Sequence, residues 1–424
     1  MKKIITLFSL LFTLLLSAQS TYLHCGKLID TKKGKVLNEM TIVVTGNKIT
    51  AVQKGYVQPL SDKDKTIDLK SKTVMPGLID MHVHIEGEYD AYSYVNRFRL
   101  EDADVAFRSA VFAKRTLMAG FTTVRDLGGS GVNIALRKAI NNGMVTGPRI
   151  YTAGKAIGTT GGHADPTNGV RKELRGDPGP KEGVINSVAD AKKAVRQRYK
   201  NGADVIKITA TGGVLSVAKD GSGPQFTTDE LAEIVKTAND YGMITAAHAH
   251  GAEGMKRAVL AGITTIEHGT LMTEEIMGLM KQKGTYYVPT ITAGKYVAEK
   301  AAIKGFYPAL VVPKALAIGP QIQNTFSKAY KSGVLIAFGT DAGVFPHGEN
   351  GKEFGFMVEA GMSPIKAIQS ATTVNAKVLK NDALGSIEAG KLADIIATDD
   401  NPIKNINTME KVSFVMKGGV VYKK

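Results

Sequence analysis

A pair of histidines ends a strongly apolar segment of the sequence. His82 and His84 close the run Pro-Gly-Leu-Ile-Asp-Met-His-Val-His that begins at residue 76. Side chains alternate along a β-strand, so residues two apart point to the same side. Two imidazoles placed in this way can bind one metal ion, although histidines in a buried strand can also be satisfied by backbone partners. The pair alone leaves both roles open.

Three further candidate ligands lie where other apolar segments end. His248 and His268 end the segments 244–248 and 264–268, and Asp341 ends the run Ala-Phe-Gly-Thr-Asp. If these segments are parallel strands of one barrel, their C-terminal ends meet at a single mouth. Histidine and carboxylate are ligands of zinc and similar divalent ions. The pattern therefore predicts a metal site, in which Asp341 either acts as a ligand alone or also transfers protons.

Lys207 is the cationic candidate in this group. It lies near the end of the apolar segment 203–210, Ala-Asp-Val-Ile-Lys-Ile-Thr-Ala, which is expected to reach the same mouth. A protonated lysine beside metal ions is electrostatically unfavourable. Lys207 is therefore expected to be neutral or to be converted into an anion.

The elements that must position these residues read as an α/β fold. Eight apolar segments alternate with segments of helical periodicity, as expected of a (β/α)8 TIM barrel. The expected strands are 78–84, 122–126, 149–153, 204–210, 244–248, 264–268, 285–289 and 335–341. The expected helices include 105–119, 188–201, 228–241, 254–261 and 274–283.

Both ends of the chain carry short strands and turns instead. Residues 40–45 and 49–52 flank Gly46-Asn47, and residues 393–397, 412–416 and 420–422 are strand-like. Neither end has enough apolar residues to form a core alone. We therefore expect residues 21–76 and 384–424 to form one small, discontinuous β-sandwich beside a barrel of residues 77–383.

Residues 1–20 have the pattern of a signal peptide. Lys2 and Lys3 precede an apolar run over 4–16, and small or polar residues follow at 17–20. The run is shorter than the roughly 20 residues of a membrane span, and an uncleaved anchor is the alternative. We expect a periplasmic or secreted protein with no membrane association after cleavage. Cys25 is the single cysteine, so no intrachain disulfide can form, and a buried thiol is preferred over lipid attachment.

Composition and charge exclude other classes of protein. Hydrophobic residues make up 43% of the 424 residues, which is enough for a large core and argues against extensive disorder. The net charge is +15, but Lys and Arg are scattered along helical segments such as 192–200 and form no basic block with aromatic residues. A solvated basic surface explains the charge, and no nucleic-acid partner is expected.

The sequence resembles the amidohydrolase superfamily over nearly the whole mature chain, including both β flanks. Within it, the chain is similar to the branch of imidazolonepropionase-like proteins, Xaa-Pro and Xaa-Arg/Lys dipeptidases and ochratoxin-hydrolysing amidases. The resemblance is carried by Gly-Thr-Asp-Ala-Gly at 339–343 and by Lys207 with the following Ile-Thr-Ala-Thr-Gly-Gly. It implies two zinc or similar divalent ions, bridged by Lys207 as a carboxylated lysine. It also assigns His82, His84 and Asp341 to the first ion, and His248 and His268 to the second.

This resemblance implies a mechanism. Two cations that share a water lower its pKa so that hydroxide exists near neutral pH, and one ion can polarise the substrate carbonyl. Asp341 would then accept the proton of the water as general base and deliver it to the departing amine as general acid. Barrels of this family often assemble, which leaves a homo-oligomer open.

Four other residues are candidate substrate contacts. His163 follows the third predicted strand, His250 lies two residues beyond His248, and His347 follows the last strand. Structural roles in loops, or in orienting a ligand, are the alternatives for these histidines. Phe226 lies where some dipeptidases of the similar branch carry a tyrosine. It lacks the hydroxyl, and this departure means that their substrate specificity does not transfer directly.

Three functions fit the pattern. The first is hydrolysis of the amide bond of a dipeptide or an N-acyl amino acid, with Xaa-Pro or a hydrophobic C-terminal residue favoured. The second keeps the site but acts on a cyclic amide, a lactone or a deaminase-type substrate. The third is a non-catalytic metal-binding protein on the same scaffold, which the complete ligand set argues against.

Overall fold

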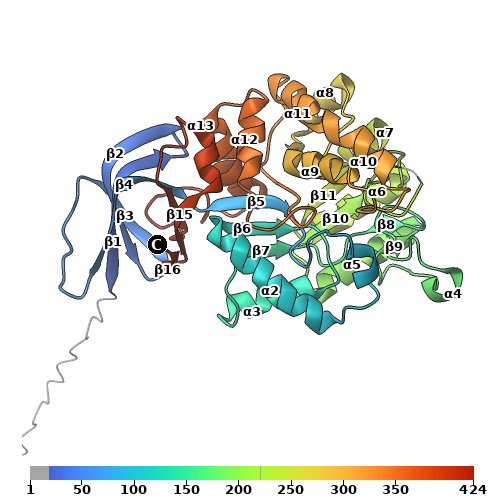
Figure 1. Cartoon of the computed structure of the whole chain (residues 1–424), viewed down its shortest axis with the longest axis horizontal. Helices are drawn as coiled ribbons and strands as arrows, with labels where there is room; N and C mark the ends of the chain where they lie inside the picture. The colour runs from blue at the N-terminus through green and yellow to red at the C-terminus, as the bar shows by residue number, and fades with distance from the viewer. Residues whose placement is uncertain (1–18, 220) are drawn as a thin grey trace, which may run out of the picture.

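The computed structural model describes residues 19–219 and 221–424, which form a barrel with a small β module at one side (Figure 1). Residues 1–18, which hold most of the expected signal peptide, lie outside the described residues, as does residue 220. Across the two described ranges, no helix combines the length and the apolar character needed to span a lipid bilayer.

Parallel strands form the barrel in the order of the sequence. Hydrogen-bonded ladders join β5 to β6 and β7, and join β10 to β11, β12 and β13. A parallel pairing of Ile157 with Ile208 connects the two ladders. The strands are β5 Leu78–Val83, β6 Phe121–Asp126, β7 Arg149–Thr152, β10 Val205–Thr209, β11 Ile244–Ala249, β12 Thr265–His268 and β13 Tyr286–Val288, with the short β8 Gly158–Thr159 and β9 Val184–Ile185 outside them.

Residues 335–342 take the eighth position of the barrel. Tyr287 N donates to Leu335 O at 2.8 Å, and Asp341 N donates to His82 O at 2.7 Å, so the segment is bonded to β13 and to β5. The sequence predicts a strand here, whereas the structure has isolated pairings. The reason is local: Asp341 has a φ of 61°, in the left-handed region, which interrupts a regular ladder. The (β/α)8 barrel itself is confirmed.

Helices follow the barrel strands and lie around them (Figure 1). Ser187 Oγ accepts a hydrogen bond from Asp190 N at the start of α5, and Gly202 ends this helix in the left-handed conformation. Thr227 and Glu230 form a capping box that begins α6. The helices are α1 Ser93–Asn96, α2 Asp102–Met118, α3 Val132–Asn141, α4 Lys172–Arg175, α5 Val188–Asn201, α6 Thr228–Asp240, α7 Ala252–Ala261, α8 Glu274–Lys283, α9 Ile291–Ala301, α10 Val312–Ile318, α11 Ile322–Lys331, α12 Lys352–Glu359, α13 Pro364–Gln369 and α14 Asn375–Val378, with single turns at η1 Gly319–Gln321, η2 Ser370–Val374 and η3 Ile406–Glu410.

Both ends of the chain meet in one mixed sheet. Its strand order is β16-β15-β14-β4-β1-β2-β3, with β1 and β4 parallel and the other neighbours antiparallel. Because β14 pairs with β4, strands from the two ends of the chain lie side by side in one sheet. The strands are β1 Ser20–Asp30, β2 Lys35–Thr45, β3 Lys48–Lys54, β4 Lys65–Pro76, β14 Ile395–Thr398, β15 Val412–Lys417 and β16 Val420–Lys423.

This sheet folds over an apolar core of its own. Lys48, at the start of β3, pairs with Leu392, just before β14, so distant positions of the strand order approach each other. Buried side chains that include Leu23, Ile42 and Phe414 form the core. The expectation of one β module built from both chain ends is confirmed.

The module joins the barrel without a linker. β4 ends at Pro76 and β5 begins at Leu78, with one residue, Gly77, between them. Gly77 N donates to Asp394 O at 2.8 Å, and a Cβ at Gly77 would lie 2.2 Å from Thr122 Oγ1. The junction therefore needs glycine, and it fixes the start of the first barrel strand against the module.

Candidate active site

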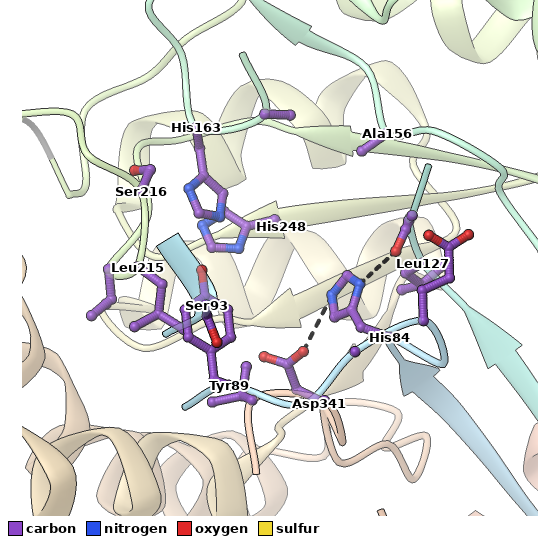
Figure 2. Close-up of a pocket in the computed structure, with 18 of the residues that line it drawn as sticks. His84, Tyr89, Ser93, Leu127, Ala156, His163, Leu215, Ser216, His248 and Asp341 are labelled. Atoms are coloured by element: carbon purple, nitrogen blue, oxygen red, sulfur yellow. Dashed lines mark hydrogen bonds and ion pairs between the residues drawn. The ribbon is translucent and has the colours of Figure 1, made fainter. Parts of the chain in front are cut away.

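A cavity of about 820 Å³ opens at the C-terminal ends of the barrel strands. Five of the six residues expected to bind metal line it. Figure 2 shows three of them, with His84 facing Asp341 and His248 beside His163. Lys207 and His268 complete these five. The sixth, His82, is fully buried, with its Nε2 3.4 Å from Asp341 Oδ1. The structure brings all six side chains to one place.

Asp341 lies at the centre of the first group of candidate ligands. Its Oδ1 lies 3.4 Å from His82 Nε2 and 3.3 Å from His84 Nε2, and its Oδ2 lies 4.0 Å from His268 Nδ1. His82, His268 and Asp341 each offer a ligand atom within 4.8 Å of the others. The family resemblance pairs His268 with His248; the structure places it beside both His248, at 4.7 Å between ring centroids, and Asp341.

These atoms form an electron-rich cluster. His82 Nε2 and Asp341 Oδ1 are buried and have no hydrogen-bond partner among the described residues. Burial lowers the pKa of His82 well below its ordinary value and that of His84 to about 4, so both rings are neutral near pH 7. Burial also raises the pKa of Asp341 to about 8. A neutral imidazole lone pair that faces the ionised carboxylate is unfavourable unless a cation lies between them. The residues present therefore fit a divalent metal ion.

Hydrogen bonds on the far side of the first two rings fix which nitrogen faces the cavity. His82 Nδ1 donates to Glu267 Oε2 at 2.8 Å, and His84 Nδ1 donates to Gly128 O at 2.8 Å. Glu267 is held in turn by Arg125, whose Nη2 donates to Glu267 Oε1 at 2.8 Å. With Nδ1 protonated, the Nε2 lone pairs of both rings remain available to bind a metal.

Two more rings reach the cavity from the ends of β11 and β12. His248 Nε2 donates to Gly212 O at 3.1 Å, which leaves Nδ1 unprotonated in the neutral ring. His268 Nδ1 lies 2.7 Å from Thr290 Oγ1, which leaves Nε2 for another partner. Burial lowers the pKa of both rings well below the ordinary value, so each offers a neutral nitrogen.

Three non-glycine residues at this mouth have a positive φ. The values are 68° at His268, 52° at Thr290 and 61° at Asp341, and they make up three of the five such residues in the described chain. Left-handed backbone costs on the order of 1–3 kcal/mol at a non-glycine residue and concentrates at functional sites. Here His268 and Asp341 are candidate ligands, and Thr290 contacts His268.

Lys207 is 3% exposed in β10 and lines the same cavity. Burial lowers the pKa of its ammonium group to about 8, while Glu267 and Asp341 act in the opposite sense. A neutral amine is therefore accessible near neutral pH. Neutral amine is the form of a lysine side chain that can act as a nucleophile.

Two of the expected substrate contacts lie at the cavity. His163 and His250 both line it, and the His163 ring lies 4.3 Å from the His248 ring (Figure 2). Gly213 makes room for His163, because a Cβ at this glycine would lie 2.3 Å from the imidazole. Burial lowers the pKa of His163 to about 3 and that of His250 to about 4, so both are neutral hydrogen-bonding groups.

The other two expected substrate contacts, Phe226 and His347, are not among the residues that line the cavity. Phe226 is 3% exposed in the barrel core, and its backbone carbonyl accepts a hydrogen bond from Arg257 at 2.9 Å. His347 packs behind His84: its Nε2 lies 3.2 Å from His84 O, and its ring stacks on Phe112. Apolar packing and backbone carbonyls satisfy these two side chains, so neither needs to face a substrate.

Glu267 and Arg125 are candidates that the sequence alone did not single out. Both are fully buried. Glu267 accepts the hydrogen bond from His82 Nδ1, and Arg125 in turn donates to Glu267. The available signal was an ionisable residue inside an apolar strand, since such residues are rarely buried without a partner. Glu267 directly precedes His268, and Arg125 lies within the predicted strand 122–126.

An apolar surface adjoins the histidines in the cavity. It includes Tyr89 and Tyr94 after β5, Val297 on α9, and Ile318 and Ile322 near η1. The cavity therefore combines a polar side that carries the candidate ligands with an apolar side that can accept an uncharged group.

Comparison with known proteins agrees with this geometry. A profile of the amidohydrolase family matches residues 73–422. The chain belongs to the amidohydrolase family. It is thus a hydrolytic enzyme of a family that generally binds divalent metal ions, and His82, His268 and Asp341 are a group of side chains that could hold one.

Individual relatives of this amidohydrolase cover nearly its whole length. The ochratoxinase of Aspergillus niger is 32% identical over 435 residues, which span 96% of this chain and 87% of the relative. A crystal structure of a Xaa-Pro dipeptidase with bound methionine in the active site matches with a TM-score of 0.93 and 54% identity, over 96% of this chain and 100% of that one. A prolidase complexed with N-methylphosphonate-L-proline matches with a TM-score of 0.86 and 33% identity, over 96% and 100%.

Proposed function

We propose that this amidohydrolase is an exported, zinc-dependent enzyme that cleaves the amide bond of dipeptides or N-acyl amino acids. The observation that carries the proposal is the convergence of four histidines, Lys207 and Asp341 on one cavity, where His82 Nε2 and Asp341 Oδ1 are buried and find no hydrogen-bond partner within 19–219 and 221–424. Export is supported by the sequence pattern of residues 1–20.

The cluster has the donors for two divalent ions. His82, His84 and Asp341 would hold the first, and His248 and His268 the second, with a carboxylated Lys207 shared between them. When bound, the two ions supply an acidified water and an electrophile that polarises the scissile carbonyl.

Asp341 moves the proton. It accepts one proton from the attacking water on a carboxylate oxygen and delivers it to the nitrogen of the departing amine. The hydrogen bond from Asp341 N to His82 O and the left-handed backbone at Asp341 support this role, because they hold the carboxylate at the cavity before substrate binds.

His163 is placed to bind the substrate carbonyl or carboxylate. Its Nδ1 is buried without a hydrogen-bond partner among the described residues, and its ring lines the cavity beside His248. His250 is better placed to orient its neighbours, because its Nδ1 already lies 3.0 Å from Thr270 Oγ1.

The relatives and the cavity support a substrate with proline or an apolar residue at its C-terminal end. One related structure is a Xaa-Pro dipeptidase that holds methionine in its active site, and another is a prolidase that holds a phosphonate derivative of proline. The apolar surface that includes Tyr94, Val297 and Ile322 offers a place for such a side chain or ring.

The test is an assay of the purified mature enzyme, supplied with zinc and bicarbonate, on Xaa-Pro, Xaa-Met and Xaa-Arg dipeptides and on N-acyl amino acids. We expect cleavage of Xaa-Pro or Xaa-Met substrates in preference to Xaa-Arg, and loss of cleavage after chelation. Failure of the zinc-loaded enzyme to release an amino acid from any member of the panel would contradict the proposal.

A further inference from the structure

We propose that Lys314 is a positioning residue that fixes one wall of the active-site cavity. The wall is residues 211–218, which follow β10 and are called the β10 loop below. Four consecutive residues of this loop, Val214, Leu215, Ser216 and Val217, line the cavity. Lys314 lies on α10, about a hundred residues later in the chain, with a sequence separation of 101 from Gly213.

The ammonium group of Lys314 gathers three backbone carbonyls of the β10 loop. Lys314 Nζ donates to Gly213 O at 2.9 Å, to Ser216 O at 2.8 Å and to Ala218 O at 2.9 Å. A lysine ammonium carries three N–H donors, and hydrogen bonds from a charged donor are about twice as strong as neutral ones. One side chain thus ties residues 213, 216 and 218 together and stabilises the bent conformation of the loop.

The same loop contacts three histidines of the cavity through its backbone and small side chains. Gly212 O accepts the hydrogen bond from His248 Nε2 at 3.1 Å. Thr211 Oγ1 accepts a hydrogen bond from His250 N at 2.9 Å. Gly213 packs directly on the His163 ring, as its hypothetical Cβ at 2.3 Å shows. Lys314 binds residues 213, 216 and 218, so loss of its ammonium should shift the substrate-facing wall at 213–218 more than Thr211 and Gly212, which contact His250 and His248.

Lys314 also connects separate walls of the cavity. It belongs to the region after β13, which contributes Ile318 and Ile322 to the lining, and it holds the loop after β10. Tyr94, from the region after β5, donates its hydroxyl to Leu215 O at 2.6 Å, inside the stretch that Lys314 binds. Three βα-connections are thus joined at residues 213–218. Loops of this kind are otherwise the mobile part of a barrel.

Removing the ammonium should loosen the β10 loop while leaving the other ligands in place. His82, His84 and Asp341 are held by contacts that do not involve the loop. Substrate affinity should therefore fall more than turnover does, because the wall lines the cavity but does not transfer protons. This kinetic expectation rests on the proposed amidase function; the expectation about the mobility of the loop does not.

The experiment compares Lys314→Met with Lys314→Arg, and uses Lys304→Met as the matched control at an exposed lysine that precedes α10 in the sequence. For Lys314→Met, we expect amide hydrogen exchange in peptides spanning 211–218 to accelerate at least about tenfold, the factor set by losing a single charge-assisted hydrogen bond. KM should rise about tenfold with kcat changed about threefold at most. Lys314→Arg should show smaller increases than Lys314→Met in both the exchange rate and KM. Lys304→Met should change neither the exchange rate nor KM.

Unchanged exchange over 211–218 in a folded Lys314→Met protein would overturn the proposal whether or not a substrate is known. Faster exchange together with an equal fall in kcat and unaltered KM would also overturn it, because the loop would then act on the chemistry and not on the wall. If the wild type shows no amidase activity, the exchange result alone decides about Lys314, and the proposed function fails separately.

Discussion

The mouth of the barrel and the β module of the chain ends are built in opposite ways. The module buries apolar side chains such as Leu23, Ile42 and Phe414 between hydrogen-bonded strands. The mouth buries His82, Lys207 and other ionisable groups. In the part of the chain that the structure describes, it leaves polar atoms without hydrogen-bond partners and holds three of the five non-glycine residues with a positive φ. Packing in the module stabilises the folded state. The buried ionisable groups and strained backbone of the mouth destabilise it, but they form a site that can bind cations.

This difference predicts that substitution of a candidate ligand at the mouth changes activity more than stability, and that substitutions in the module do the reverse. Few residues belong to both regions. Gly77 is one, because it joins β4 to β5 and packs against Thr122.

The largest effect is expected from Asp341→Asn. Asparagine keeps the shape of the side chain but cannot accept and return the proton, so kcat/KM should fall about 10²–10⁴-fold. The thermal unfolding midpoint should stay close to that of the wild type, since an unpartnered carboxylate is removed. Steady-state kinetics and a melting curve check both, with Asp382→Asn at an exposed position as the control. Activity within about twofold of wild type would remove Asp341 from the mechanism.

The next effect is expected from Glu267→Gln. The glutamine amide has one oxygen, so it cannot accept the hydrogen bonds from His82 Nδ1 and from Arg125 on separate oxygens as the carboxylate does. The His82 ring should therefore be held less firmly, and its Nδ1 protonation should be less well fixed. Metal affinity should fall about 10–100-fold, and the unpaired Arg125 should cost about 3–5 kcal/mol of stability. A titration of activity against buffered zinc and a urea unfolding curve measure the two. Unaltered zinc affinity would show that the Glu267–Arg125 pair is purely structural.

A change in the module should act on stability alone. Phe414→Ala removes a buried ring from the module core and should lower the free energy of unfolding by about 3–5 kcal/mol. The kcat per folded molecule should stay constant, as measured at a temperature where both proteins are folded. Phe107→Ala, at a side chain that is 77% exposed on α2, is the control and should change stability by about 0.5 kcal/mol or less. A matching loss of kcat in Phe414→Ala would break the separation between the two regions.

The smallest effect is expected at Cys25 in the module. Burial raises the pKa of the Cys25 thiol to about 12, so the thiolate that reacts with disulfide or alkylating reagents is scarce at pH 8. The folded protein should therefore label far more slowly than the urea-unfolded protein, which should take up one equivalent for its single cysteine. Rapid stoichiometric labelling of the folded protein would place Cys25 outside the module core.

The comparison also explains what could be predicted from the sequence. Strand ends in a parallel barrel share one mouth, so His82, His248 and Asp341 could be placed together from strand position alone. The alternation of short strands likewise sufficed to pair the chain ends. Loop residues carry no such rule, and the directions of Phe226 and His347 depended on tertiary packing.

Side-chain contacts between residues far apart in the sequence could not be predicted for the same reason. The contact of Lys314 with the β10 loop joins residues about a hundred positions apart, and the link from Arg125 through Glu267 to His82 joins three strands. Nothing in local periodicity encodes such contacts. Buried charge within an apolar strand was the one usable signal, and it pointed to Lys207 because that residue follows the pattern of the other ligands.

The most direct test of the central claim is the metal content of the purified mature enzyme beside its Lys207→Ala variant, both prepared with zinc and bicarbonate. We expect about two zinc ions per chain in the wild type, less in the variant, and amide hydrolysis that chelation abolishes and zinc restores. A wild-type protein that holds no stoichiometric metal after this supplementation would contradict the account.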